Sequence, residues 1–177
     1  MKIKGIPGIL AMGVALSLLS LSAPLASAQS MSMSDKHFMK DAAEGGLAEV
    51  ELGQLAQQRA SDPQVKAFGE RMVRDHSKAN EKLKALAQSK NVDLPTSISM
   101  TDKATKMRLS HLSGAEFDKA YMQDMVKDHT DDVNDFTKES SKAEDPDLKA
   151  FVKETLPTLQ EHLKKAQEIE PKVTAQK

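Results

Sequence analysis

Hydrophobic residues recur every three or four positions along four long stretches of the chain, which is the spacing that buries one face of an α-helix. These stretches cover about residues 35–60, 63–90, 114–143 and 146–170. The pairs Asp62-Pro63 and Asp145-Pro146 each place a capping carboxylate before a proline at the first helical position. Ser34, and the capping box that begins at Ser113, fit the starts of the other two helices. The pattern therefore predicts four long helices and no β-sheet.

The connections between these helices differ in length. Helices one and two join tightly, as do helices three and four, so each pair is expected to be antiparallel. Residues 91–113 separate the pairs, and Ser99 is placed to cap a short helix within them. A connection of this length can cross a whole bundle. We therefore expect an all-α, ferritin-like four-helix bundle over residues 35–170, with a long crossover carrying a short extra helix. Pro171 would end the last helix and begin a tail over residues 171–177.

The first 28 residues have the pattern of a secretory signal peptide. Lys2 and Lys4 precede a mostly apolar run over residues 9–21, and Ala26-Ser27-Ala28 is an A-x-A cleavage site. The run is shorter than the ~20 residues that a membrane-spanning helix needs. We expect cleavage after Ala28, a flexible segment over residues 29–34, no membrane span after cleavage, and a periplasmic or secreted protein.

Composition narrows the possible functions. The formal net charge is −1, and removing the two lysines of the leader leaves −1 − 2 = −3 for the mature chain. That balance does not fit a nucleic-acid-binding protein. The chain has no cysteine, so it has neither disulfides nor thiolate ligands. It also has no G-x-S-x-G, phosphate-loop or H-E-x-x-H motif.

Three histidines lie at helical positions where the pattern calls for a core residue. His76, His129 and His162 are on the second, third and fourth helices, and Glu49 takes such a position on the first. Each lies about 20–25 Å from its turn, near mid-helix, at ~1.5 Å per residue. If the crossover puts the two turns at opposite ends of the bundle, all four side chains meet at one level.

Three imidazoles and a carboxylate are suitable ligands for zinc, copper or iron. The acids before two of the histidines, Asp75 and Asp128, cannot face their own neighbours but could orient a histidine on an adjacent helix. Met72 and Met125 lie one turn before the same two histidines, where thioethers would suit Cu(I) or would simply fill the core.

Two other interpretations remain open at this point. Glu49 and the three histidines could form a closed hydrogen-bonded network without a metal, because buried polar groups need partners. Alternatively, Gly45-Gly46 could break the phase of the first helix, so that the four side chains do not converge.

Several short motifs resemble those of a bacterial exported family, domain-of-unknown-function family 4142, which is grouped with ferritin-like bundles. The resemblance covers about residues 35–169. The motifs that carry it are Gly46-Leu47-Ala48-Glu49-Val50, Val65-Lys66-Ala67-Phe68, Met72-Val73-Arg74-Asp75-His76, Leu112-Ser113-Gly114-Ala115-Glu116-Phe117-Asp118 and Leu156-Pro157-Thr158-Leu159-Gln160-Glu161-His162. It implies a periplasmic helical bundle and no particular activity, because the family's function is not established.

The sequence departs from ferritins at an important point. Di-iron bundles carry Glu-x-x-His on two helices, whereas Val73, Val126 and Leu159 stand three residues before the histidines here. Our leading hypothesis is an exported, non-enzymatic helical protein whose central His/Glu group binds a transition metal. The alternative is a structural or stress-related envelope protein, and a metal-dependent oxidoreductase is the least favoured.

Overall fold

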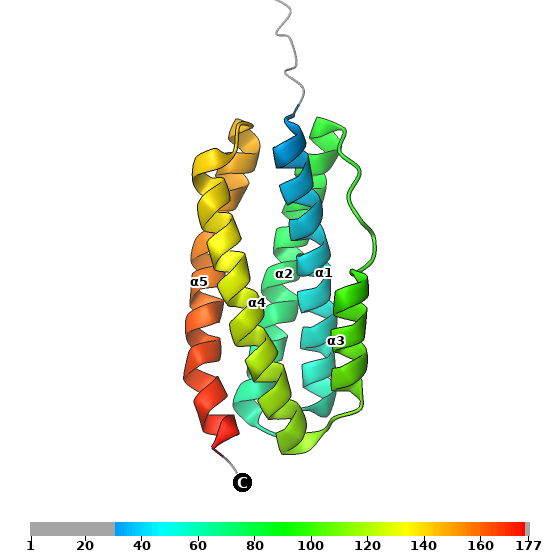
Figure 1. Cartoon of the computed structure of the whole chain (residues 1–177), viewed down its shortest axis with the longest axis vertical. Helices are drawn as coiled ribbons and strands as arrows, with labels where there is room; N and C mark the ends of the chain where they lie inside the picture. Colours follow the sequence, from blue (N-terminus) through cyan, green and yellow to red (C-terminus); the bar gives the residue numbers. More distant parts are fainter. Residues whose placement is uncertain (1–30, 176–177) are drawn as a thin grey trace, which may run out of the picture.

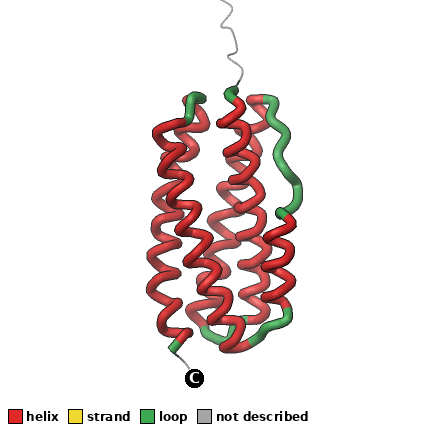
Figure 2. Tube along the Cα trace, in the orientation of Figure 1, coloured by secondary structure: helices red, strands yellow, loops and turns green. Residues whose placement is uncertain are grey.

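The computed structural model describes residues 31–175, which form four long helices and one short one (Figure 1). The helices are α1 (Met33–Arg59), α2 (Pro63–Lys90), α3 (Met100–Ser110), α4 (Gly114–Lys142) and α5 (Pro146–Thr174). Figure 2 shows helix and loop but no strand in this part of the chain. The predicted signal peptide lies outside the described residues. No helix within them is both long enough and apolar enough to cross a membrane.

The helices form two antiparallel hairpins, α1 with α2 and α4 with α5. Residues 91–113, which include α3, run from the end of α2 along the bundle to the start of α4 (Figure 1). The α1–α2 turn and the α4–α5 turn therefore lie at opposite ends, at the bottom and the top of Figure 1. The all-α bundle with a long crossover carrying a short helix is confirmed.

Most of the predicted helix starts have the expected caps. The Asp62 side chain accepts a hydrogen bond from the backbone N–H of Gln64, and Asp145 caps α5 in the same way. The Ser99 hydroxyl caps α3. Ser113 is the exception, because its side chain makes no cap hydrogen bond to α4.

Two predicted helix boundaries were wrong, the start of α1 and the end of α5. α1 begins at Met33 with Ser32 as its cap, two residues before the predicted start capped by Ser34. α5 runs through Pro171 to Thr174 instead of ending at residue 170. A proline removes only one helical hydrogen bond donor, and Val173, just beyond it, is buried in the core. Burying this side chain offsets the missing hydrogen bond, so the helix continues.

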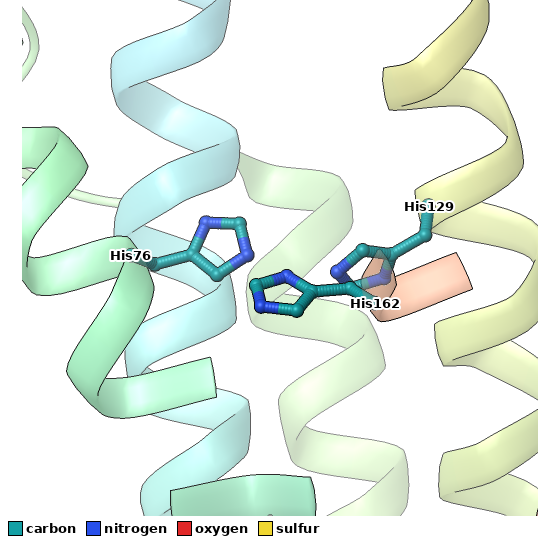
Figure 3. A group of neighbouring side chains, drawn as sticks. All are labelled: His76, His129 and His162. Atoms are coloured by element: carbon teal, nitrogen blue, oxygen red, sulfur yellow. The ribbon is translucent and has the colours of Figure 1, made fainter. Parts of the chain in front are cut away.

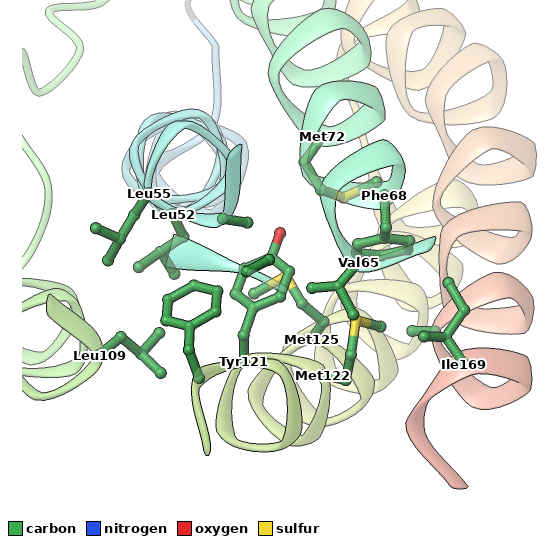
Figure 4. Packing of buried hydrophobic residues seen from close by; sticks show 14 of the residues in the cluster. Leu52, Leu55, Val65, Phe68, Met72, Leu109, Tyr121, Met122, Met125 and Ile169 are labelled. Carbon is green, nitrogen blue, oxygen red and sulfur yellow. The ribbon is translucent and has the colours of Figure 1, made fainter. Parts of the chain in front are cut away.

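Two hydrophobic clusters fill the bundle, one in each half. The lower core, shown in part in Figure 4, lies toward the α1–α2 turn and includes Leu52, Val65, Phe68, Met72, Leu109, Phe117, Tyr121, Met122, Met125, Ala166 and Ile169. The upper core lies toward the α4–α5 turn and includes Met39, Leu83, Phe136, Leu148, Phe151, Val152 and Leu159. The predicted histidine positions belong to neither cluster and lie between them.

Within the first hairpin, α1 and α2 approach each other closely. A Cβ added at Gly53 would lie 2.7 Å from the carbonyl oxygen of Gly69, and one added at Gly69 would lie 2.7 Å from the Cβ of Ala56. Any larger residue at Gly53 would force the two backbones apart. The two glycines therefore set the separation of α1 and α2 below the level of the histidines.

Each turn is held by a buried carboxylate from the other hairpin. Asp118 of α4 accepts hydrogen bonds from the backbone N–H groups of Ser61 and Asp62, at 3.1 and 2.9 Å, and from the Ser61 hydroxyl. Asp35 of α1 accepts from the backbone N–H of Asp145 at 2.8 Å. Both carboxylates are only 1% exposed. These contacts fix the two hairpins in register along the bundle axis.

Replacing Asp118 with alanine should therefore destabilise the fold. The substitution removes the buried carboxylate that accepts hydrogen bonds from the α1–α2 turn, at a cost of about 2–3 kcal/mol. We expect the melting temperature to fall by roughly 5–10 °C for a domain of this size. Thermal unfolding followed by circular dichroism measures it. The control is Asp131→Ala, which removes a side chain that is 62% exposed. Equal melting temperatures for the two variants would contradict the assigned role of Asp118.

Candidate metal centre

Three imidazole rings meet at mid-height in the bundle. His76 comes from α2, His129 from α4 and His162 from α5, and all three are buried. Their ring centroids lie 5.3–5.7 Å apart (Figure 3). Each ring offers one possible ligand nitrogen, and these three atoms lie within 4.8 Å of one another. We call these three residues the histidine triad.

Two of the rings are held through their outer nitrogens. The Nδ1 of His129 lies 3.0 Å from the backbone carbonyl oxygen of Met125, and the Nε2 of His162 lies 2.9 Å from Oδ2 of Asp75. A carbonyl or a carboxylate oxygen can only accept, so each of these nitrogens carries the proton and donates it. The other nitrogen of each ring, Nε2 of His129 and Nδ1 of His162, then has a free lone pair. This is the arrangement that orients histidine ligands in metal sites.

The inner nitrogens have no hydrogen-bond partner. Nε2 of His76, Nε2 of His129 and Nδ1 of His162 are buried, and no donor or acceptor within residues 31–175 reaches them. Buried polar atoms are almost always paired in proteins. Three unpaired atoms in one place do not form a closed network, and they match the lone pairs that a bound cation requires.

The protein environment keeps the triad uncharged. Burial lowers the pKa of His76 well below its ordinary value, and the two neighbouring histidines lower it further. Burial lowers the pKa of His129 to about 4. The pKa of His162 is also lowered by burial, although its bond to Asp75 acts in the opposite direction. Neutral imidazole is the form that binds metals, so the rings do not have to lose a proton at neutral pH.

Asp75 is itself anchored by two arginines. Arg71 contacts it at 3.2 Å and also pairs with Glu161, and Arg74 contacts it at 2.9 Å. Partial burial acts to raise the pKa of Asp75, but hydrogen bonds from Arg74, His162 and Arg71 outweigh it and lower the pKa to about 2. Asp75 is therefore a permanent anion that holds His162. The contribution of Arg71 was missed from the sequence, although its spacing four residues before Asp75 is typical of a helical ion pair.

Glu49 lies beside the triad and not within it. Its side chain is buried, and Oε1 lies 3.9 Å from Nδ1 of His129, the nitrogen that bonds to the Met125 carbonyl. Burial, reinforced by nearby acids such as Asp132 and Asp128, raises the pKa of Glu49 well above its usual value. Burial thus favours the protonated form of Glu49, which lies on the opposite side of His129 from the inner nitrogens.

The remaining candidates lie around the triad. Asp128 is close to Lys127, at 3.7 Å, and is partly exposed. Met72 and Met125 are fully buried members of the lower core. Phe68, from the same core, packs edge-on against His129 and His162, with ring centroids 6.1 and 6.5 Å apart. The structure thus places the two methionines in the apolar layer beneath the histidines.

The fold and this centre define a helical-bundle protein with a buried cluster of three histidines. The chain belongs to the family described as Domain of unknown function (DUF4142), which its sequence matches over residues 20–169. No curated protein matches the sequence.

Solved structures show a similar fold at low sequence identity. One is described as the crystal structure of a DUF305 fragment from Deinococcus radiodurans, with a TM-score of 0.71 and 11% identity, covering 80% of this chain and 98% of that chain. CopM in the Cu(II)-bound form has a TM-score of 0.66 and 14% identity, covering 78% and 96%. CopM in the Cu(I)-bound form has a TM-score of 0.63 and 17% identity, covering 76% and 93%.

The lowered pKa of His129 can be measured directly in the metal-free protein. An unfolded histidine protonates near pH 6.5, whereas folded His129 resists protonation until about pH 4. This pKa difference adds roughly 3 kcal/mol to the free energy of unfolding at pH values above 6.5. The contribution is lost as the pH falls from 6.5 toward 4. NMR of the imidazole carbons, assigned with His129→Gln, should show no protonation of His129 between pH 7.5 and 5.5. A midpoint near 6.5 would mean that the ring is solvated and not buried.

Proposed function

We propose that this protein binds one transition-metal ion through the histidine triad. The observation that carries the proposal is that three buried, neutral rings each direct an unpartnered nitrogen to one place. The outer bonds of His129 and His162 support it, because they leave lone pairs on the inner nitrogens. A purely structural network has less support, because it would pair those same atoms.

Copper is the ion that we favour. Imidazole nitrogen suits copper, zinc and iron alike, but the similar bundles named CopM are Cu(I)-bound and Cu(II)-bound forms. Three protein ligands leave a further coordination position open, as in metal sites that exchange ligands and unlike closed structural sites. The proposed role is thus reversible binding of copper. The proposed location is the periplasm, on the strength of the signal-peptide pattern in residues 1–28.

Metal binding should stabilise the wild-type protein and not a triad variant. An ion at a hundred times its dissociation constant adds about 2.7 kcal/mol to the free energy of unfolding, which raises the melting temperature by several degrees. We expect this rise with Cu²⁺ at pH 7.5, its reversal by chelator, and its absence in His129→Ala. Because protons compete for the imidazoles, the rise should shrink at acid pH. Thermal melts with Cu²⁺, Zn²⁺ and chelator measure these effects.

Two variants serve as controls for that series. His111→Ala removes an exposed histidine at the end of α3 and should keep the full rise. Glu49→Gln should also keep it, because Glu49 lies outside the triad. A wild-type melting curve that is unaffected by every metal would refute the proposed function. Loss of the rise in Glu49→Gln would make Glu49 a ligand and would revise the ligand set.

Asp75 should tune the affinity of the site without being a ligand. Asp75→Asn removes the charge that orients His162, and loss of such a supporting group typically weakens metal binding 10- to 100-fold. Isothermal titration with Cu²⁺ measures the change. Glu161→Gln is the matched control, because Glu161 pairs with the same Arg71 but forms no hydrogen bond with a histidine among the described residues. If both variants bind as tightly as wild type, the Asp75–His162 bond has no part in the site.

A further inference from the structure

A groove on the surface lies between the first half of α1 and the second half of α4. Its volume is about 310 Å³, and besides His37 its ionisable lining has four acids, Asp41, Asp132, Asp135 and Glu139, against two lysines, Lys138 and Lys142. A groove in which acids outnumber bases attracts cations from solution.

A much smaller cavity lies beside His76, one member of the triad. It has a volume of about 30 Å³ and is lined by Gly45, His76, Asp132 and Phe136, among others. Three residues, Ala42, Asp132 and Phe136, line both the groove and this cavity. The two spaces therefore adjoin at Asp132. His76 lines the smaller, inner cavity, and its buried Nε2 has no hydrogen-bond partner.

Gly45, which is partly exposed, lines the inner cavity on its α1 side. A Cβ added at Gly45 would meet no atom within 4 Å, so a side chain there has free space to occupy. At the next position the wall is closed, since a Cβ added at Gly46 would lie 2.1 Å from Oδ1 of Asn80. The free space beside Gly45 is therefore specific to that residue.

The size of the inner cavity limits what can pass through it. A cavity of about 30 Å³ has room for only about one or two water molecules, so a metal ion with its full hydration shell does not fit. An ion that moves inward must lose water, and a carboxylate at the junction can replace the lost oxygen ligands. Burial, together with Asp128, Asp135 and Asp131, raises the pKa of Asp132 to about 7, so a cation that displaces its proton meets little resistance at neutral pH.

We propose that metal ions reach the triad through this groove, and that Asp132 is the transfer residue that binds the ion before His76 does. This inference rests on the proposed function and adds to it the route and the residue that control loading. Asp132 acts on the rate of transfer and takes no part in the final ligand set. It should therefore change the association and dissociation rate constants by the same factor and leave the dissociation constant unchanged.

The test is the rate at which the metal-free protein takes up Cu²⁺. Tyr121 is the only tyrosine in a chain without tryptophan, and it lies on α4 two turns before His129, so quenching of its fluorescence by Cu²⁺ reports loading. Stopped-flow mixing gives the association rate constant, and transfer to excess chelator gives the dissociation rate constant. For Asp132→Asn we expect both to fall about tenfold or more, within the range by which local charge alters association.

Asp131→Asn is the matched control, because it makes the same substitution at the adjacent, exposed position, which borders neither space. Its rate constants should stay within twofold of wild type. Gly45→Leu tests the route by a second physical means: its side chain fills the free space, so loading should slow without loss of the final stoichiometry.

The outcomes are distinguishable. The proposed route would be overturned if Asp132→Asn took up Cu²⁺ as fast as the control Asp131→Asn. It would also be overturned if Gly45→Leu took up Cu²⁺ as fast as wild type. Either result would leave copper binding itself intact. A faster dissociation in Asp132→Asn would make Asp132 a ligand of the bound ion and would also overturn the route. A wild-type protein that takes up no Cu²⁺ at equilibrium would refute the proposed function itself.

Discussion

The register between the two helical hairpins rests on two buried carboxylates, Asp35 and Asp118, each of which binds the turn of the opposite hairpin. His76 belongs to one hairpin, whereas His129 and His162 belong to the other. Sliding one hairpin by a single helical turn would displace His76 by about 5 Å. That displacement is as large as the present spacing of the ring centroids, 5.3–5.7 Å. The triad therefore exists only while both turns are held.

The polar layer between the two hydrophobic cores has a cost. A buried polar atom without a partner costs about 1–3 kcal/mol, and the triad contains three such atoms. Because burial lowers the pKa values of the three rings and keeps them neutral, the cost is that of unpaired dipoles and not of buried charges. Proteins keep unfavourable features of this kind mainly at functional sites. The energetics of the layer thus agree with the proposed binding of a cation, which would pair all three atoms at once.

Much of this arrangement could be predicted from the sequence, because the helical rise per residue is constant. Counting residues from the two Asp-Pro turns placed the three histidines at one level. The residue spacing gives the height of a side chain along the bundle but not which nitrogen of a nearby ring it approaches. We therefore expected Glu49 as a ligand. In the structure it lies near Nδ1 of His129, the nitrogen that bonds to the Met125 carbonyl. The roles of Asp35 and Asp118 depend on contacts between the hairpins, which no local pattern encodes. The extension of α5 through Pro171 likewise depends on tertiary burial.

The division of the triad between the hairpins has a mechanical consequence. His76 and His129 are 129 − 76 = 53 residues apart along the chain, which has no cysteine. An ion held by both hairpins would act as a reversible cross-link between them, and because the site forms only in the folded chain, binding would stabilise that state. It would also resist the two halves swinging apart in the folded state. Occupancy of the site would then be reflected in the stiffness of the whole bundle, a property that a protease or a partner protein can sense without contacting the ion.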